Sequence, residues 1–146
     1  MAPTIPKVQT IIGSEFPRKV IPLINEAKLS IEIIVFDWRW YPQNPGGSVQ
    51  LFNQSLVRAV RRKVKIRAIT NNNEIISTLT NVGIHAKKVI SKKLVHSKMM
   101  IIDNRILIMG SHNYTQSAFQ MNLETSLIIE NQSTVERFLT FFNNLF

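Results

Sequence analysis

The sequence predicts an α/β fold in which a mixed β-sheet is flanked by helices on both faces. Short apolar runs rich in β-branched residues alternate along the chain with longer segments whose apolar residues recur at helical spacing. No linker, tandem repeat or low-complexity tract interrupts that alternation. The chain has 146 residues, of which 45% are hydrophobic, so it is long and apolar enough to bury a sizeable core. We therefore expect a single domain over residues 1–146.

The first half of the chain is predicted to alternate between strands and helices. A helix is indicated where Val20, Leu23 and Ile24 recur with a helical period, and a buried strand where residues 31–36 form a run rich in β-branched side chains. Ser48 is expected to cap the helix that follows a loop containing proline and glycine. In chain order we predict a strand at residues 7–12, a helix at 16–29, a strand at 31–36, a loop at 37–48, a helix from 48 to about 63 and a strand at 64–70.

The second half is predicted to continue this pattern and to add a hairpin. Asn104 and Arg105 lie between two apolar runs, which indicates a tight turn, and Gly83 is expected to end a helix. In chain order we predict a helix at residues 73–81, strands at 84–89, 94–102 and 106–109, a loop or short helix at 114–119, a strand at 125–129 and a terminal helix at 133–146.

The chain is strongly basic. Its 18 Lys and Arg residues against 9 Asp and Glu residues give a net charge of +9. The positive residues gather at positions 58–67 and again at positions 87–93, just ahead of His96. Such clusters attract polyanions, although similar charge runs also occur on ordinary solvated surfaces. Nucleic acid is therefore one expected partner.

Other features of the sequence bear on the cellular compartment of the protein. Cysteine is absent, which excludes disulfides, thiol nucleophiles and thiolate zinc sites. The first residues lack a basic region followed by a continuous apolar stretch, and no later apolar run approaches the roughly 18 residues that span a bilayer. We expect a soluble, cytoplasmic protein without stable membrane insertion.

The strongest chemical signal lies between His96 and Asn113. This stretch reads His-x-Lys, four residues, Asp, six residues, Gly-Ser-x-Asn. On a strand of period two, His96 and Lys98 project from the same face. A nucleophile or base is thus expected beside a fixed positive charge, which suits attack on a phosphate diester.

These residues resemble the HKD motif of the phospholipase D superfamily, with every separation in agreement. The matching residues are His96, Lys98, Asp103, Gly110, Ser111 and Asn113. The segment Asn122-Leu123-Glu124 also resembles the short Asn-x-Glu that follows the motif in small bacterial nucleases of that superfamily. The resemblance implies an α-β-α sandwich and a phosphodiesterase that needs no metal or other cofactor and works through a phosphohistidine intermediate.

The resemblance also implies a role for each matching side chain. His96 corresponds to the nucleophile, Lys98 and Asn113 to the groups that bind the non-bridging oxygens, and Ser111 to their supporting partner. Glu124 falls where the superfamily keeps an acid that hydrogen-bonds the histidine, fixes its tautomer and stabilises developing charge. Asp103 is the aspartate of the motif and has a more structural role, although turn formation alone explains it nearly as well.

A single motif leaves the expected reaction one histidine short, because the mechanism implied by the resemblance uses one imidazole as nucleophile and another as general acid. We therefore predict a homodimer in which a two-fold axis brings the two copies of His96 to one shared site. His85 and His112 form no recognisable metal-ligand spacing, so no metal is expected.

Further residues are expected at the rim of the site. Trp38 and Arg39 belong to an aromatic and cationic cluster that suits stacking on unpaired bases, but the rings fit equally well as a cover for the core, as part of a dimer interface or at a lipid headgroup boundary. Lys92 and Lys93 precede His96 and are candidates for substrate binding. The phenylalanine-rich end of the chain is more simply explained by core or dimer contacts.

Three functions remain open from the sequence. We favour a metal-independent endonuclease of low sequence specificity, on the strength of the charge and the motif. A phospholipase D or phosphatidyl transferase acting on lipid headgroups is the alternative, and a non-catalytic nucleic-acid-binding protein is a third possibility. Backbone chemistry does not distinguish DNA from RNA or single from double strands.

Overall fold

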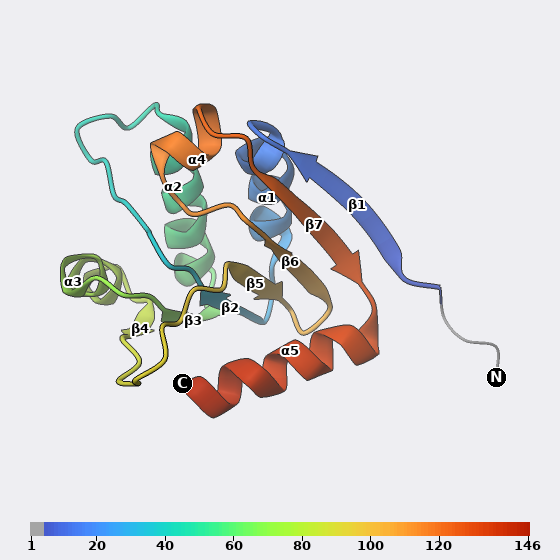
Figure 1. Ribbon diagram of the computed structural model, residues 1–146. Coiled ribbons are helices and arrows are strands. Elements are labelled where there is room, and N and C mark those ends of the chain that lie inside the picture. The colour runs from blue at the N-terminus through green and yellow to red at the C-terminus, as the bar shows by residue number, and fades with distance from the viewer. Residues whose placement is uncertain (1–4) are drawn as a thin grey trace.

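The computed structural model describes residues 5–146 and shows a mixed seven-stranded sheet with the order β1-β7-β6-β5-β2-β3-β4 (Figure 1). Strands β2, β3 and β4 run parallel, and the other neighbouring pairs run antiparallel. Helices α2 and α3 connect the parallel strands, as the alternating pattern predicts. The strands are β1 (Lys7–Ile12), β2 (Ser30–Ile34), β3 (Lys65–Ile69), β4 (His85–Lys87), β5 (Met99–Ile102), β6 (Ile106–Gly110) and β7 (Thr125–Glu130).

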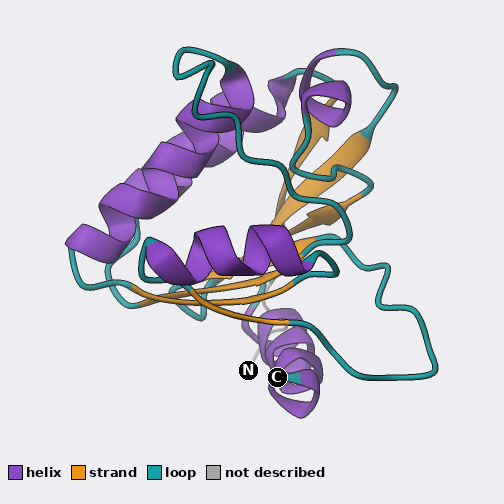
Figure 2. Ribbon diagram, turned by 90° about the vertical axis from the view of Figure 1, so that its left-hand side faces the viewer, coloured by secondary structure: helices purple, strands orange, loops and turns teal. Residues whose placement is uncertain are grey.

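Helices cover both faces of the sheet (Figure 2). They are α1 (Glu15–Glu26), α2 (Ser48–Arg61), α3 (Asn73–Asn81), α4 (Gln116–Gln120) and α5 (Gln132–Leu145). Residues of α1, α2, α3 and α4 join one core, whereas α5 packs on the opposite face. The predicted fold class is confirmed. No helix among residues 5–146 has both the length and the apolar character needed to cross a membrane.

Strand β2 shows how one short segment serves both cores. Ile31 and Ile33 belong to the core under α1 and α2, while Ile34 packs in the core under α5. All three side chains are fully buried. A central strand that is covered on both faces is apolar at successive positions, which explains the run of β-branched residues in the sequence.

The strand that carries the motif begins later than predicted. The sequence predicts a strand from residue 94 through His96 and Lys98, but β5 begins only at Met99. The amide of Gly110 donates to the carbonyl of Lys98 at 3.3 Å, so the preceding segment still lies beside β6. His96 is thereby freed from the sheet ladder and is exposed.

The hairpin turn is shifted by one residue from its predicted position. Asp103 and Asn104 occupy its centre with φ values of 54° and 53°, and the amide of Arg105 donates to the carbonyl of Ile102 at 3.0 Å. Asp and Asn tolerate this left-handed conformation better than most residues, and a turn with two positive φ values matches the twist of the flanking strands. Arg105 is therefore the last residue of the turn and not a central one.

The predicted cap of α2 is wrong. Gly47 is the N-cap residue, and Ser48 is the first residue of the helix. The Ser48 hydroxyl instead accepts a hydrogen bond from the Gln120 side chain at 2.9 Å, which links α2 to α4. The other predicted elements exist, with ends that differ by a few residues.

Candidate active site

The β5–β6 hairpin brings the two parts of the motif together. Strand β5 follows His96 and Lys98, and β6 leads into Ser111 and Asn113. The strands pair antiparallel with Met99 opposite Met109, so the residue before β5 and the residue after β6 lie at the same end of the sheet. The spacing of the motif is therefore the spacing of a hairpin with a three-residue turn.

His96 and Lys98 are in direct contact. The Lys98 Nζ lies 3.0 Å from Nδ1 and 3.3 Å from Nε2 of the His96 ring, and it donates to the His96 carbonyl at 2.9 Å. Partial burial lowers the pKa of Lys98, and the nearby carboxylate of Glu124 opposes that effect. The predicted pairing of an imidazole with an ammonium group is present, although it arises from an irregular segment instead of a strand.

Two supporting residues of this pair were not anticipated from the sequence. The Phe36 ring packs against the His96 ring with 4.7 Å between centroids. The Asn71 amide nitrogen donates to the carbonyls of Phe36 at 3.1 Å and Val95 at 3.4 Å. Asn71 thus ties the end of β2 to the residue that precedes His96. Its position just after β3 was the available signal, because polar residues at the carboxyl ends of parallel strands gather at one edge of a sheet.

Asn113 is oriented by the segment that follows β2. Its Oδ1 accepts a hydrogen bond from the Asp37 amide at 3.0 Å, which leaves the NH2 group as the donor for a ligand. The amide of Tyr114 donates to the Asp37 carbonyl at 3.0 Å and the amide of Arg39 donates to the Tyr114 carbonyl at 3.0 Å, so the two segments pair locally. These contacts hold the Asn113 side-chain amide in place.

Ser111 and Glu124 form a second hydrogen-bonded group. The Ser111 hydroxyl donates to Glu124 Oε1 at 2.7 Å and accepts from the Thr125 amide at 3.1 Å, while the Asn122 amide nitrogen donates to Glu124 Oε2 at 3.0 Å. Burial by itself acts to raise the pKa of Glu124, but the hydrogen bonds from Ser111 and Asn122 hold that pKa below its usual value. Within residues 5–146 of one chain, no hydrogen bond joins Glu124 to His96.

Gly110 leaves no room for a side chain. A Cβ atom at this position would clash with the Ser126 hydroxyl and with the Thr125 carbonyl oxygen. The close approach of β6 to β7 therefore requires the glycine of the motif. This close approach also fixes the position of the next residue, Ser111, whose amide donates to the Thr125 carbonyl at 2.9 Å.

His112 anchors the motif from the inside. Its ring lies 2.7 Å from the Ser126 hydroxyl and 2.8 Å from the Gly13 carbonyl, and it stacks on Phe16 at 4.6 Å between centroids. Burial lowers the pKa of His112. Both ring nitrogens are engaged, so this histidine serves the packing of the loop. Among residues 5–146, no group of three His, Cys, Asp or Glu side chains is placed to hold a metal ion.

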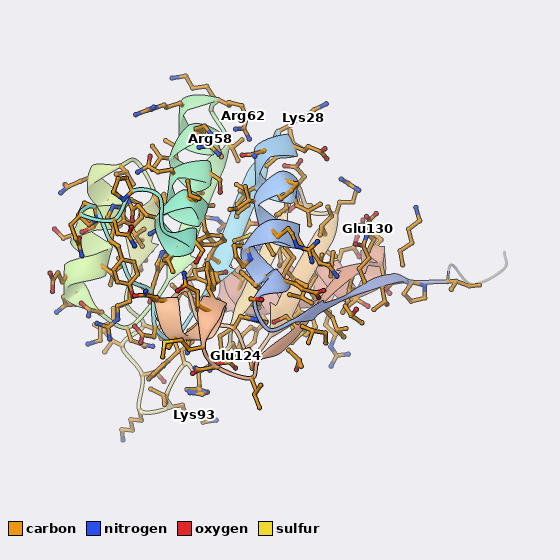
Figure 3. The ribbon with its side chains drawn as sticks, turned by 90° about the horizontal axis from the view of Figure 1, so that it is seen from above. Lys28, Arg58, Arg62, Lys93, Glu124 and Glu130 are labelled. Carbon is orange, nitrogen blue, oxygen red and sulfur yellow. The ribbon has the colours of Figure 1, made fainter. Side chains whose placement is uncertain are left out.

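Asp103 lies at the opposite end of the hairpin from His96. Seven residues of extended chain separate the two, which corresponds to roughly 20 Å. Its carboxylate accepts from the amides of Lys28 at 3.0 Å, Leu29 at 2.7 Å and Ser30 at 3.2 Å. Figure 3 shows Lys28 and Glu124 on opposite sides of the molecule. The structure therefore does not bring Asp103 to the other residues of the motif, and it places its carboxylate on the backbone between α1 and β2.

Of the two residues predicted in an aromatic and cationic cluster at the rim of the site, the structure buries Trp38 and exposes Arg39. Trp38 is only 1% exposed, and its indole N–H donates to Asn53 at 2.8 Å, so the prediction of a stacking platform at Trp38 is wrong. The ring is instead part of the core, where Tyr114 packs against it edge-on. Arg39 is exposed and pairs with Asp37 at 2.8 Å.

Lys92 and Lys93 are exposed on the segment between β4 and β5. Figure 3 shows Lys93 on the same side of the molecule as Glu124.

A pocket of about 530 Å³ opens beside the motif. His96, Lys98 and Ser111 line it from the motif, and Arg137 and Phe141 line it from α5. The sequence did not single out α5 as part of the site. Phe142, from the same phenylalanine-rich segment, is buried in the core as expected.

Known proteins share both the fold and the sequence pattern. Over 139 residues the chain is 33% identical to a mitochondrial cardiolipin hydrolase of Canis lupus familiaris, which covers 91% of this chain and 51% of that protein. The chain spans about half the length of the curated relatives it matches. The phospholipase D family member Nuc from Salmonella typhimurium has a TM-score of 0.80 at 24% identity, covering 97% of this chain and 94% of that one. NucT from Helicobacter pylori has a TM-score of 0.78 at 19% identity, covering 97% and 96%.

The fold and the site define a protein of the phospholipase D superfamily of phosphodiesterases. Residues 20–146 match the family described as "Cardiolipin synthase, PLD-like domain", and the chain belongs to that family. The resemblance inferred from the motif is confirmed.

Proposed function

We propose that this protein is a metal-independent endonuclease that cleaves nucleic acid with low sequence specificity through a phosphohistidine intermediate. The contact between the exposed His96 ring and the Lys98 ammonium, in a chain of net charge +9, is the observation that carries this proposal. An anionic polymer is attracted to the surface, and its phosphate meets a nucleophile and a cation together.

The first chemical step forms a bond from a His96 nitrogen to phosphorus and breaks the bond to the leaving oxygen. Lys98 and the Asn113 NH2 group bind the non-bridging oxygens as their negative charge grows. The leaving alkoxide takes a proton from a second imidazole. In the next step a water molecule gives a proton to that imidazole and attacks phosphorus, and the bond to His96 breaks.

The second imidazole must come from another copy of the chain. His112 is buried with both ring nitrogens engaged, and His85 lies on β4 with its ring against Phe146. We therefore assign the general acid to the partner's His96 in a homodimer. The exposed apolar residues near the site support such an interface, because Leu94 is 67% exposed and Leu123 is 103% exposed.

The same dimer supplies a partner for Glu124. This carboxylate is held ionised by its hydrogen bonds, and it keeps lone pairs free beyond those that Ser111 and Asn122 occupy. We assign it to orient the partner's His96. The site would then be complete only in the dimer.

A lipid headgroup is the alternative substrate. The cardiolipin hydrolase named above is one reason to retain it, and the exposed aliphatic side chains of Leu94 and Leu123 are another, since they also suit contact with a membrane surface. The intact His96 argues against a protein that only binds nucleic acid.

The deciding experiment presents several phosphodiesters to one preparation. Single- and double-stranded DNA and RNA, and vesicles that contain cardiolipin or phosphatidylglycerol, are incubated with the protein in excess chelator at one stated salt concentration. We expect nucleic-acid cleavage that His96→Ala abolishes. Cleavage of lipid alone, or binding of nucleic acid without cleavage, would overturn the proposal. A requirement for added metal would overturn its metal-independent mechanism.

A further inference from the structure

We propose that the pocket between the motif and α5 is a subsite for one unpaired nucleobase next to the scissile phosphate, and that Arg137 binds the adjacent backbone phosphate. This inference rests on the proposed nuclease function and assigns a substrate-binding role to a helix that the motif does not include. Figure 1 shows α5 passing beneath β2, β5 and β6, the three central strands of the sheet.

The position of the pocket dictates what enters it. His96, Lys98 and Ser111 form one of its walls, so a group in the pocket is directly bonded to, or one linkage away from, the phosphorus that His96 attacks. The volume of about 530 Å³ falls within the range of roughly 300–1,000 Å³ that small-molecule sites occupy. A base with its sugar is of this size class.

The lining of the pocket suits a flat aromatic ring. Met99 and Met109 contribute thioethers from the sheet, while Phe138 and Phe141 contribute rings from α5. Thioethers and phenyl rings both pack well against aromatic faces. Phe141 is 46% exposed, so its ring is available for stacking. Stacking of this kind tolerates any base, which agrees with low sequence specificity.

Arg137 adds a second cation to the site. It lies one turn before Phe141, so both side chains are on the same face of α5. Among residues 5–146, no acidic side chain forms an ion pair with Arg137. A free guanidinium is well suited to a phosphate group. Lys98 from the motif and Arg137 from α5 therefore place two cations beside one largely apolar pocket, which suits a base flanked by two phosphates of a polynucleotide strand.

The base must be unpaired to reach this pocket. In a duplex the base is stacked on its neighbours and paired with the other strand, so its flat faces are not available to Phe141. The subsite therefore contributes to cleavage of single strands and not to cleavage of intact duplex.

The experiment changes both the protein and the substrate. Wild type, Phe141→Ala, Phe141→Leu and Arg137→Gln are assayed on a single-stranded oligonucleotide, on the same oligonucleotide with abasic residues in place of nucleotides, and on the duplex. Leu29→Ala is the control, because Leu29 is 64% exposed and adjoins the backbone segment that Asp103 binds, at the other end of the hairpin.

We expect Phe141→Ala to lower kcat/KM on the normal single strand by about tenfold, the scale of one base stacked on an aromatic ring, and to leave the abasic strand and the duplex unchanged. Phe141→Leu should resemble the alanine variant, because it keeps apolar volume but loses the ring. Arg137→Gln should lower kcat/KM on the normal and abasic strands alike.

The failures of the two proposals are distinguishable. If the wild type cleaves no nucleic acid, the proposed function fails and the subsite fails with it. If the wild type cleaves but Phe141→Ala slows normal, abasic and duplex substrates equally, or converts a dimer into a monomer in light scattering, the nuclease stands and the face of α5 is a subunit contact instead.

Discussion

The two ends of the β5–β6 hairpin use the polar residues of one motif in opposite ways. At one end His96 is exposed beside Lys98, and within residues 5–146 the Lys98 ammonium is the one hydrogen-bond partner of its ring nitrogens. At the other end the carboxylate of Asp103 is occupied by three backbone amides. Two residues of one sequence pattern therefore differ in use: the His96 ring is available for chemistry, whereas the Asp103 carboxylate is committed to architecture.

Removal of His96, the proposed nucleophile, tests the reactive end most directly. We expect His96→Ala to lower kcat by about 10⁴-fold or more, because the covalent route is lost. The free energy of unfolding measured in urea should stay within about 0.5 kcal/mol of wild type, because the side chain is exposed. His85→Ala is the matched control and should retain activity. Comparable activity in His96→Ala would place the nucleophile elsewhere.

Removal of the cation should have the next largest effect. We expect Lys98→Ala to lower kcat by about 10²–10³-fold, the scale seen when one group that stabilises charge in the transition state is deleted. Steady-state kinetics should show the loss mainly in kcat and not in KM. Lys93→Ala removes an exposed lysine of the neighbouring segment and should change kcat far less. Equal effects of the two variants would mean that Lys98 acts only through long-range attraction.

The architectural end should respond in stability instead. Asp103→Ala removes the acceptor of three amides and places alanine at a positive φ, so we expect a loss of about 1–3 kcal/mol in the free energy of unfolding. Asp103→Asn keeps one oxygen and tolerates the turn, so it should lose less. The kcat of the folded fraction should stay within about threefold of wild type in both. A large fall in kcat at unchanged stability would instead give Asp103 a part in the reaction.

His112 is a structural residue that lies between two residues of the candidate site, Ser111 and Asn113. Burial keeps its pKa in the folded chain below the value of 6.5 for an unperturbed histidine, so the unfolded chain takes up a proton first as pH falls. Stability should therefore decrease as pH drops from about 7 through 6.5, with a slope of at most about 1.4 kcal/mol per pH unit for one proton. Urea unfolding between pH 7.5 and 5.5 measures this slope, which His112→Gln should reduce and His85→Gln should leave unchanged.

The fold and the meeting of the two parts of the motif were predictable because the signals are local. Periodicity fixed the order of strands and helices, and the motif spacing encodes a hairpin whose two ends meet. The exact start of β5 was missed because Leu94 to Ile102 alternate as a strand does, although the ladder begins only at Met99. Alternation reports which face a residue takes, and it does not report where the hydrogen bonds of a partner strand begin.

The contributions of distant segments were not predictable. Phe36 and the residues of α5 reach the site only through tertiary packing, and nothing in their own neighbourhoods marks them as functional. For Asn71 the one signal was its position just after β3. Trp38 illustrates the converse error. An aromatic cluster has the same composition in a core as on a stacking surface, and only the contacts with Tyr114 and Asn53 show that this ring is buried.

The smallest expected effect tests whether two chains share one site. If each shared site needs His96 from both subunits, a dimer of one wild-type and one His96→Ala chain is inactive. After subunits are mixed in equal amounts and exchanged at random, half of the wild-type chains sit in such mixed dimers. The activity per wild-type chain should therefore fall to about half, whereas mixing with Asp103→Asn, whose chains are expected to be active themselves, should not lower it. Activity that stays constant as His96→Ala is titrated in, with exchange verified by a fluorescent label, would mean that one chain carries a complete site.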